Sequence, residues 1–156
     1  MQSIEIRKGK EEDVSALLGL ITELAIYEKA GDQVEVTEED LRRDGFGDHP
    51  IFEFFVALEG DRIAGIALYY TKYSTWKGPC LFLEDIVVRE EDRRKGIGSR
   101  LFNAVIQVAK SRHVKRMEWQ VLDWNEPAIQ FYKKYQADIN DEWLNGRLVY
   151  DQLQQF

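Results

Sequence analysis

The order of apolar and polar residues predicts helices and strands that alternate along the chain. Ile4 and Ile6 alternate with polar residues, which indicates a short strand over residues 3–7. Apolar residues then recur every three or four positions and predict an amphipathic helix over about residues 11–28: Val14, Leu17, Leu18, Ile21, Leu24 and Ala25. The sequence Ala30-Gly31-Asp32 ends this helix.

The middle of the chain predicts a hairpin and then a central strand. Phe52–Leu58 and Arg62–Tyr73 are rich in aromatic and β-branched residues, and Glu59-Gly60-Asp61 between them is a turn signal. Leu81–Val88 is apolar except for two acidic residues, which is typical of a strand covered on both faces.

Capping signals and periodicity predict the remaining elements. They are a short helix that starts with the capping box Thr37-Glu38-Glu39-Asp40 and closes at Gly45 and Gly47, a helix marked by Ile97, Leu101, Ala104, Val105 and Val108, a strand over Arg116–Val121, a helix over Asn125–Tyr135 and a final strand over Arg147–Leu153. The chain has no linker or repeat. We therefore expect one α/β (α+β) domain over residues 1–156, a mixed sheet with helices on its faces.

Composition excludes several classes of protein. The longest apolar stretch, Ile63–Tyr70, is too short to span a bilayer, and the N-terminus has no signal-peptide core, so we expect a cytoplasmic protein without a membrane segment. Cys80 is the only cysteine, which excludes an intrachain disulfide. His49 and His113 stand far apart without a cysteine partner or an HExxH spacing, so we expect no metal site.

The charge of the chain is negative overall and uneven. A net charge of −7 argues against general nucleic-acid binding, which needs a basic face. Residues 28–40 are rich in Asp and Glu, whereas residues 89–100 are rich in Arg and Lys. Each cluster fits a solvated face, and the functional alternative is one site for an anion and a second zone for cations.

The junction between the strand that ends near Val88 and the helix that begins near Gly96 carries the strongest chemical signal. A helix N-terminus exposes unpaired N–H groups and the positive end of the helix dipole, and both suit a phosphate. Gly96 and Gly98 let backbone approach an anion closely, and the triplet Arg93-Arg94-Lys95 adds positive charge.

Two well-known phosphate patterns are absent from this segment. The pattern GxGxxG needs glycine where Leu101 stands, and a P-loop needs GxxxxGK followed by Ser or Thr. What remains is R-x-x-G-x-G at a strand-to-helix turn, which fits either an anion site or a basic loop that caps a helix.

The segment Arg93-x-x-Gly96-x-Gly98 matches the acetyl-CoA motif of the GNAT N-acetyltransferases, and the order of elements resembles the GNAT fold over essentially the whole chain. Further segments resemble the diamine (spermidine/spermine) acetyltransferase family, in the same order: Leu24-Ala25-x-Tyr27-Glu28, Asp44-Gly45-Phe46-Gly47-x-x-Pro50, Tyr69-Tyr70, Leu83-Glu84-Asp85, Gly96-Ile97-Gly98-Ser99 and Trp124-Asn125-Glu126-Pro127. Tyr73-Ser74-Thr75-Trp76-Lys77-Gly78 and Leu122-Asp123-Trp124-Asn125 are more similar to its thialysine acetyltransferase branch.

This resemblance implies an enzyme that transfers acetyl from acetyl-CoA, its co-substrate, to a primary amine of a small molecule. It places the CoA pyrophosphate on Arg93, Arg94, Lys95, Gly96, Ile97, Gly98 and Ser99. It also places the pantetheine arm against the backbone of Ile86, Val87 and Val88, and the lower part of the cofactor near Asn125 and Ala128.

Acetyl transfer needs a neutral amine, although an amine with a pKa of about 10 is mostly protonated at neutral pH. The reaction therefore needs a base for the amine and an acid for the departing thiolate. Glu84, in an otherwise apolar strand, fits either a catalytic group or a strand-end carboxylate, and Tyr132 alone would be an ordinary half-buried aromatic. The resemblance implies that Glu84 accepts the proton of the amine through water and that Tyr132 protonates the thiolate.

The resemblance places the acceptor amine against an acidic, aromatic set of residues: Tyr27, Glu28, Glu84, Trp76, Glu118, Trp119 and Gln120. Carboxylates attract ammonium groups, and aromatic faces add cation–π attraction. Packing is the alternative role for the two tryptophans of this set.

One departure from the polyamine enzymes bears on the acceptor. Ser74-Thr75 stands where those enzymes carry Asp-Pro before the tryptophan that matches Trp76, and the lost carboxylate favours thialysine, a lysine analogue or a small diamine. The resemblance also implies a homodimer with the acceptor site near the subunit interface. Two alternatives stay open: a GNAT that acts on a protein or amino-acid amine, and a non-catalytic CoA-binding module.

Overall fold

The computed structural model describes residues 3–156, so Met1 and Gln2, which open the alternating N-terminal stretch, lie outside the described residues. The chain divides into two compact units, one ending at Gln120 and the other spanning Val121–Phe156. The prediction of one domain over residues 1–156 stays a prediction.

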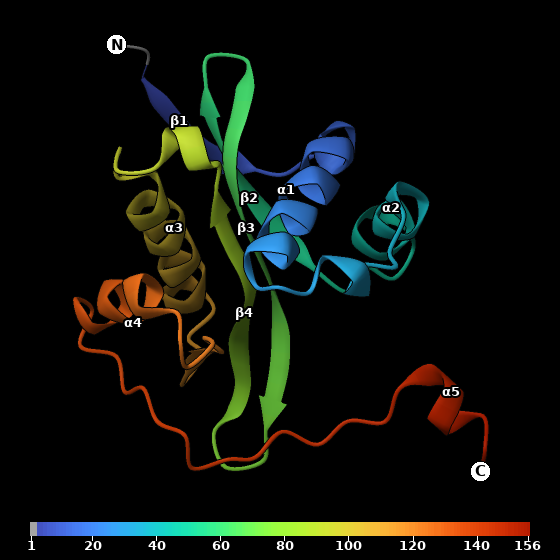
Figure 1. Ribbon diagram of the computed structural model, residues 1–156. Coiled ribbons are helices and arrows are strands. Elements are labelled where there is room, and N and C mark those ends of the chain that lie inside the picture. Colours follow the sequence, from blue (N-terminus) through green and yellow to red (C-terminus); the bar gives the residue numbers. More distant parts are fainter. Residues whose placement is uncertain (1–2) are drawn as a thin grey trace. The chain divides into compact units, whose positions relative to one another are not determined.

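Among the described residues, the first unit is built on a five-stranded sheet (Figure 1). Its strands follow one another in chain order: β1 (Ile4–Lys8), β2 (Glu53–Glu59), β3 (Arg62–Ser74), β4 (Gly78–Val88) and β5 (Met117–Trp119). The first four pair antiparallel, and β4 pairs parallel with β5. Consecutive parallel strands need a crossover, which α3 (Ile97–Ser111) supplies.

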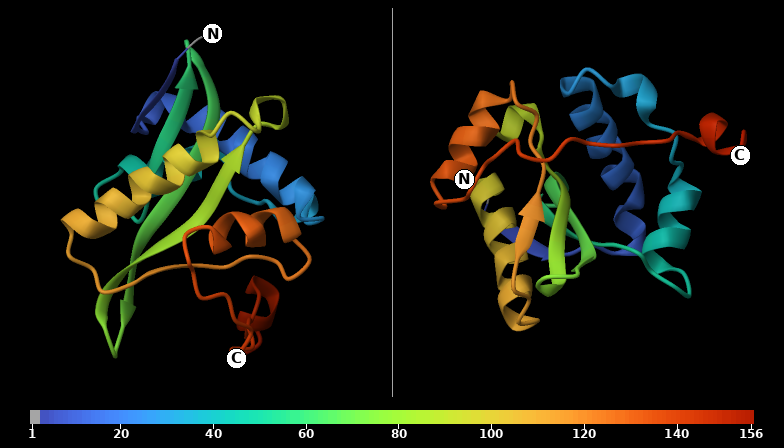
Figure 2. Two further views of the ribbon diagram at one scale, coloured as in Figure 1. Left: turned by 90° about the vertical axis from the view of Figure 1, so that its left-hand side faces the viewer. Right: turned by 90° about the horizontal axis from the view of Figure 1, so that it is seen from below.

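Helices cover both faces of this sheet (Figures 1 and 2). α1 (Val14–Tyr27) and α2 (Glu38–Phe46) lie on one face and α3 lies on the other. The core on the α1 face consists of Val14, Leu17, Leu20, Leu41, Phe54, Val56, Ile66, Leu68 and Val87. Each such side chain contributes about 1.5–3 kcal/mol when it is fully buried, so the apolar stripes of the helices fix them to the sheet. The predicted mixed sheet with helices on both faces is confirmed.

Short turns and caps join these elements. The predicted capping box is confirmed, because Thr37 Oγ1 accepts from the Asp40 N–H at 3.1 Å and Asp40 Oδ2 accepts from the Thr37 N–H at 3.0 Å. Turns of 3₁₀ helix precede α1 (η1, Glu11–Asp13), follow it (η2, Gly31–Gln33) and follow β4 (η3, Glu90–Asp92).

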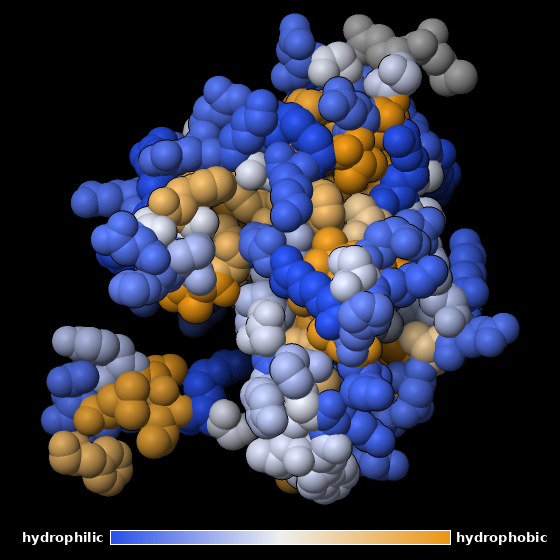
Figure 3. Space-filling view, turned by 180° about the vertical axis from the view of Figure 1, so that it is seen from behind, coloured by the Kyte–Doolittle hydropathy of each residue, from blue (hydrophilic) through white to orange (hydrophobic). Residues whose placement is uncertain are grey.

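The second unit contains α4 (Glu126–Lys133) and α5 (Tyr150–Leu153). The predicted final strand over Arg147–Leu153 is wrong: its second half is the helical turn α5, where Gln152 Oε1 accepts from the Val149 N–H at 3.0 Å. Alternating apolar residues form a strand only beside a partner strand, and within the described residues this segment has none. Its apolar side chains are therefore at the surface (Figure 3): Leu148, Val149, Tyr150 and Leu153 are each more than half exposed.

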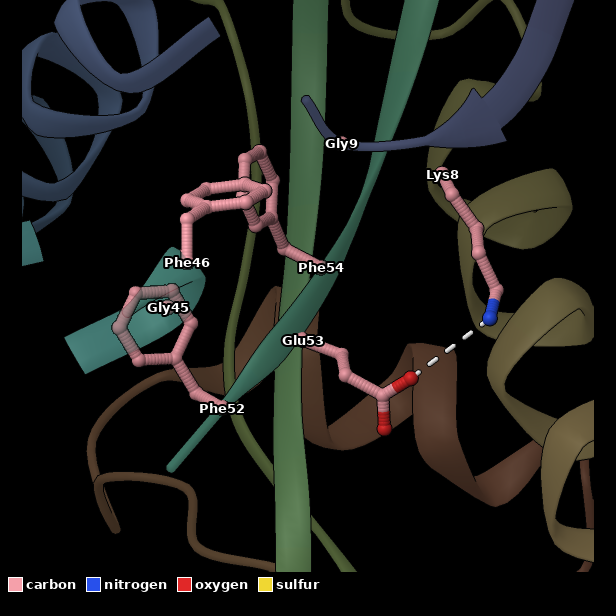
Figure 4. Close-up of a pocket in the computed structure, with 7 residues that line it drawn as sticks. All are labelled: Lys8, Gly9, Gly45, Phe46, Phe52, Glu53 and Phe54. Atoms are coloured by element: carbon pink, nitrogen blue, oxygen red, sulfur yellow. Dashed lines mark ion pairs between the residues drawn. The ribbon is translucent and has the colours of Figure 1, made fainter. Parts of the chain in front are cut away.

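A close approach of backbone to an aromatic ring fixes the end of β1. Gly9 lies against Phe54 in a hollow between β1, β2 and α2, whose rim carries the ion pair between Lys8 and Glu53 at 3.6 Å (Figure 4). The Phe54 ring is buried and packs edge-on against Phe46, with 6.0 Å between the ring centres. A Cβ at Gly9 would overlap ring carbons of Phe54.

We expect Gly9→Ala to lower the free energy of unfolding by about 1–3 kcal/mol, the usual cost of overpacking. Gly19→Ala is the matched control, because Gly19 lies within α1 and a Cβ there would meet nothing within 4 Å. That variant should gain about 0.5–1 kcal/mol from helix propensity. Urea denaturation measures both, and equal effects of the two substitutions would contradict the packing argument.

Candidate active site

The sheet opens between β4 and β5. The two strands pair only over Leu81–Leu83, whereas β4 continues to Val88. On its other edge β4 remains paired with β3, up to Val88 opposite Gly65. Among the described strands, none pairs with the β5-facing edge of Ile86–Val88. Backbone N–H and C=O groups need partners, so this edge suits a ligand with amide groups of its own.

The N-terminus of α3 lies just beyond this open edge. Gly96 caps the helix with a φ of 77° and no side-chain hydrogen bond, and a Cβ at this position would meet nothing within 4 Å. The first bond of the helical ladder runs from the Arg100 N–H to the Gly96 carbonyl at 3.2 Å. The N–H groups of Ile97, Gly98 and Ser99 precede that bond, as a phosphate site at a helix start requires.

The three side chains of the basic triplet before α3 have different surroundings. Arg93 Nε donates to the Val88 carbonyl at 3.3 Å, and its guanidinium lies 5.7 Å from the centre of the Tyr27 ring. Lys95 Nζ contacts carboxylate oxygens of Glu59 and Asp92, both at 3.1 Å. Arg94 has a φ of 67° and no hydrogen bond or ion pair with the described residues. Arg94 is thus the member of the triplet that has no hydrogen bond, ion pair or ring contact among the described residues.

Glu84 stands at a β-bulge. Leu68 of β3 faces Asp85, and Tyr69 faces Leu83, so Glu84 is an extra residue of β4 without a partner. Paired residues share a face of the sheet, which places Asp85 with Leu68 on the α1 face. Glu84 turns to the same face, where its Oε1 accepts from the Tyr70 hydroxyl at 2.8 Å. The bulge therefore puts two consecutive carboxylates on one face.

These carboxylates form an acidic cluster with Glu28, the residue that ends α1. Burial raises the pKa of Asp85 to about 7, and the negative charges of Glu84 and Glu28 add to the rise. Burial, and then the charge of Glu84, also raises the pKa of Glu28. Burial and the hydrogen bond to Glu84 raise the pKa of Tyr70 to about 12. A cluster in which the charge of Glu84 adds to the rise in pKa of both Glu28 and Asp85 favours a bound cation, because a cation relieves the repulsion.

The other predicted acceptor residues lie in different surroundings. Trp76 is 80% exposed in the β3–β4 turn, and the six steps along the strand from Gly78 to Glu84 span roughly 20 Å. Within one chain, the structure therefore does not bring Trp76 to Glu84. Glu118 pairs with Lys72 at 2.9 Å and with Arg116 at 2.8 Å, and these bonds lower its pKa against the effect of burial.

Trp119 packs edge-on against Phe102 of α3, with 5.3 Å between the ring centres, which favours the packing role for this tryptophan. Gln120 follows Trp119 directly, at the end of the first unit. Tyr27, the last residue of α1, precedes Glu28 and lies under the Arg93 guanidinium.

The remaining predicted residues belong to α4 of the second unit. Asn125 Oδ1 caps this helix by accepting from the Ala128 N–H at 3.4 Å. Tyr132 lies seven positions after Asn125, two turns along the helix, and packs against Phe131 with 5.3 Å between the ring centres.

Sequence reasoning missed Asp85 and Tyr70 as members of the site. Both lay within segments that carry the family resemblance, but neither was given a role. The available signal was the pair Glu84-Asp85 inside an apolar strand. Strict alternation would turn these residues to opposite faces, so two acidic neighbours in a covered strand indicate a bulge.

Two further findings concern metal sites and membrane spans. No group of three or more His, Cys, Asp or Glu residues in the described part of the chain could hold a metal ion. Among residues 3–156, no helix has both the length and the apolar character needed to cross a membrane.

Comparison with known proteins identifies the class of this fold and site. Residues 20–137 match the Acetyltransferase (GNAT) family, and the chain belongs to this family. The protein is therefore an N-acetyltransferase with a GNAT fold.

Individual relatives agree with this assignment. The chain is 44% identical over 141 residues to the thialysine N-epsilon-acetyltransferase of Bos taurus, covering 85% of this chain and 83% of that protein. It is 39% identical over 158 residues to the enzyme of the same name from Mus musculus, covering 94% and 93%. The structure of an integron cassette protein from the mobile metagenome of V. cholerae superposes with a TM-score of 0.80 at 26% identity, covering 99% of this chain and 98% of that one.

The raised pKa of Asp85 predicts how stability changes with pH. The folded protein must ionise a carboxyl whose pKa is about 7 instead of 3.8, so this residue destabilises the fold increasingly as pH rises from about 4 to about 7. We expect Asp85→Asn to gain stability relative to wild type over this range, by at most about 1.4 kcal/mol per pH unit. Urea unfolding at several pH values measures the difference.

Asp13→Asn is the control of opposite sign. Burial would raise the pKa of Asp13, but hydrogen bonds from Arg7 and the Lys10 N–H lower it. The stability that Asp13 contributes is fully present above its unfolded pKa and is lost only in stronger acid, so the deficit of this variant should stay constant between about pH 5 and 8. A constant difference for Asp85→Asn as well would contradict the assignment.

Proposed function

We propose that this N-acetyltransferase takes acetyl from acetyl-CoA and transfers it directly to a primary amine of a small molecule, thialysine or a related lysine analogue or diamine. The observation that carries the proposal is the cluster of Glu28, Glu84 and Asp85, whose mutual repulsion a cationic acceptor relieves. Glu84 and Asp85 of this cluster lie on the strand whose open edge and following helix start suit the cofactor.

Three features of the chain support the binding of acetyl-CoA. The unpaired edge of Ile86–Val88 offers backbone groups to the amides of the pantetheine arm. The N–H groups of Ile97, Gly98 and Ser99, together with Arg94, meet the pyrophosphate, while Arg93 and Lys95 shape the loop around it. Asn125 and Ala128 open the helix of Tyr132, as expected of residues that contact the lower part of the cofactor.

The transfer needs three proton movements. Glu84 accepts the proton of the bound ammonium through a water molecule, and its position at the bulge leaves its second carboxylate oxygen available while Tyr70 holds the first. The neutral amine then attacks the thioester carbonyl, the C–S bond breaks, and Tyr132 gives its proton to the CoA thiolate. The acetylated nitrogen loses its surplus proton, which returns to the Tyr132 phenolate through water. Glu28 and Asp85 hold the charge of the acceptor before the proton leaves.

The choice of acceptor follows from the relatives and from the β3–β4 turn. The named relatives act on thialysine, and Ser74-Thr75 lacks the carboxylate that would attract a long polyamine. We also propose a homodimer in the cytoplasm, in which the β3–β4 turn of a second copy presents Trp76 to the acceptor. In that arrangement the exposure of Trp76 in one chain and its role in binding are compatible.

We expect purified protein with acetyl-CoA to release free thiol with thialysine faster than with lysine, putrescine, spermidine or spermine. The control is Glu84→Gln, which keeps the shape of the side chain and should bind acetyl-CoA while losing most of its turnover. Binding of CoA without turnover of any amine would favour the non-catalytic module. Preference for spermidine would contradict the inference from Ser74-Thr75, and acetylation of a protein amine alone would indicate a different acceptor class.

We expect Tyr132→Phe to lower kcat by about 10²–10⁴-fold, the usual contribution of a general acid, with little change in the dissociation constant of acetyl-CoA. Tyr135→Phe, three residues further along, is the matched control and should keep its turnover. Stopped thiol-release assays and isothermal titration measure the two quantities. Unchanged turnover in Tyr132→Phe would exclude this residue as the acid.

A further inference from the structure

The loop between β4 and α3 contains a buried acid where the binding of a phosphate calls for positive charge. Asp92, the last residue of η3, is only 2% exposed, although it stands one residue before the basic triplet. A carboxylate so close to a pyrophosphate site repels the ligand. We therefore expect the buried carboxylate of Asp92 to have a role that outweighs this repulsion.

The contacts of Asp92 show what the carboxylate holds together. One oxygen accepts from Arg62 Nη2 at 2.6 Å, and the other accepts from Lys95 Nζ at 3.1 Å. The hydrogen bond from Arg62 is the main reason that the pKa of Asp92 lies below its usual value, so the group is ionised at neutral pH. Asp92 thus links the first residue of β3 to the residue just before the cap of α3.

The same link continues to the end of β2. Lys95 Nζ also contacts Glu59, and Glu59 pairs with Arg62 across the β2–β3 turn. Three ion pairs therefore tie the loop to this turn: Arg62 with Asp92, Asp92 with Lys95, and Lys95 with Glu59. Lys95 directly precedes Gly96, whose carbonyl begins the ladder of α3.

A second set of contacts ties the start of the loop to α1 and β3. The Glu90 N–H donates to Glu23 at 3.3 Å, and Arg89 donates to the Ile63 carbonyl at 2.8 Å. Between these anchors, Arg94 adopts a φ of 67°, which a residue with a Cβ adopts at an energetic cost. Contacts on both sides of Arg94 hold the loop in a conformation that its own residues do not favour.

We propose that Asp92 is a positioning residue for the cofactor: it fixes Lys95, and with it the start of α3, so that the first-turn N–H groups face the CoA pyrophosphate. This inference rests on the proposed use of acetyl-CoA. It divides the basic triplet into Arg94, which meets the phosphate, and Lys95, which acts through Asp92.

Charge and position predict opposite results for Asp92→Asn. If the carboxylate acted only through its charge, its removal would strengthen the binding of an anion. If it positions the loop, its removal weakens binding, because the amide cannot hold two cations. The sign of the change in CoA affinity therefore separates the two roles.

The experiment compares Asp92→Asn with Glu91→Gln, since Glu91 also contacts Arg62 at 2.8 Å but is exposed and leaves the bonds of Asp92 intact. Isothermal titration with CoA should give a dissociation constant about tenfold higher for Asp92→Asn, the factor that one lost hydrogen bond to a charged group carries. Glu91→Gln should bind at least as tightly as wild type. In Asp92→Asn the KM for acetyl-CoA should rise while kcat at saturating acetyl-CoA stays near that of wild type.

Hydrogen exchange of the ligand-free protein provides a second measurement that does not depend on CoA. The amides of residues 93–99 should exchange faster in Asp92→Asn than in wild type or Glu91→Gln. If Asp92→Asn does not fold, Glu59→Gln replaces it in both measurements, because it removes the other carboxylate that holds Lys95 and charge alone would again predict tighter binding. Unchanged or tighter CoA binding together with unchanged exchange would overturn the inference, whereas failure of the wild type to bind CoA would overturn the proposed function and leave the exchange result to decide on Asp92.

Discussion

The parting of β5 from β4 after Leu83 is the constraint on which the site depends. A strand inside a sheet normally satisfies both edges, but the second half of β4 is paired on the β3 side alone. The core on the α1 face tolerates this opening because Val87 and its neighbours are held by β3 and α1 rather than by β5. The cost of unpaired backbone groups is thereby confined to the place where a ligand with amide groups can bind.

Charge is distributed around this opening in two ways. Burial and the charge of Glu84 raise the pKa of Glu28 and of Asp85, so this acidic cluster favours a bound cation. Of the basic residues before α3, Lys95 is paired with two carboxylates and therefore acts on the shape of the loop more than on its net charge. The guanidinium of Arg93 over the Tyr27 ring connects the two regions, because Tyr27 neighbours Glu28 and Arg93 belongs to the loop between β4 and α3.

Much of the fold could be predicted from the sequence because its signals are local. The spacing of Val14, Leu17 and Leu18 and the capping box at Thr37 each depend on residues a few positions apart, and both helices are present in the structure. The prediction of a final strand was wrong because an alternating segment forms a strand only beside a partner strand, and a local sequence pattern does not show whether a partner exists. The contact between Lys95 and Glu59 could not be predicted either, because the two residues are 36 positions apart and only the folded sheet brings them together.

The bulge at Glu84 also has a consequence at the level of the gene. Residues of β4 alternate between the two faces of the sheet, and the alternation before the bulge is out of phase with the alternation after it. The extra residue Glu84 produces this change of phase. Loss of a single codon there would not only remove a carboxylate: it would also force Leu81 and Leu83 to exchange faces with Phe82 or shift the pairing of the whole β3–β4 hairpin. The length of this strand therefore matters as much as the identity of its acidic residues. Loss of one codon would affect the core and the reaction together.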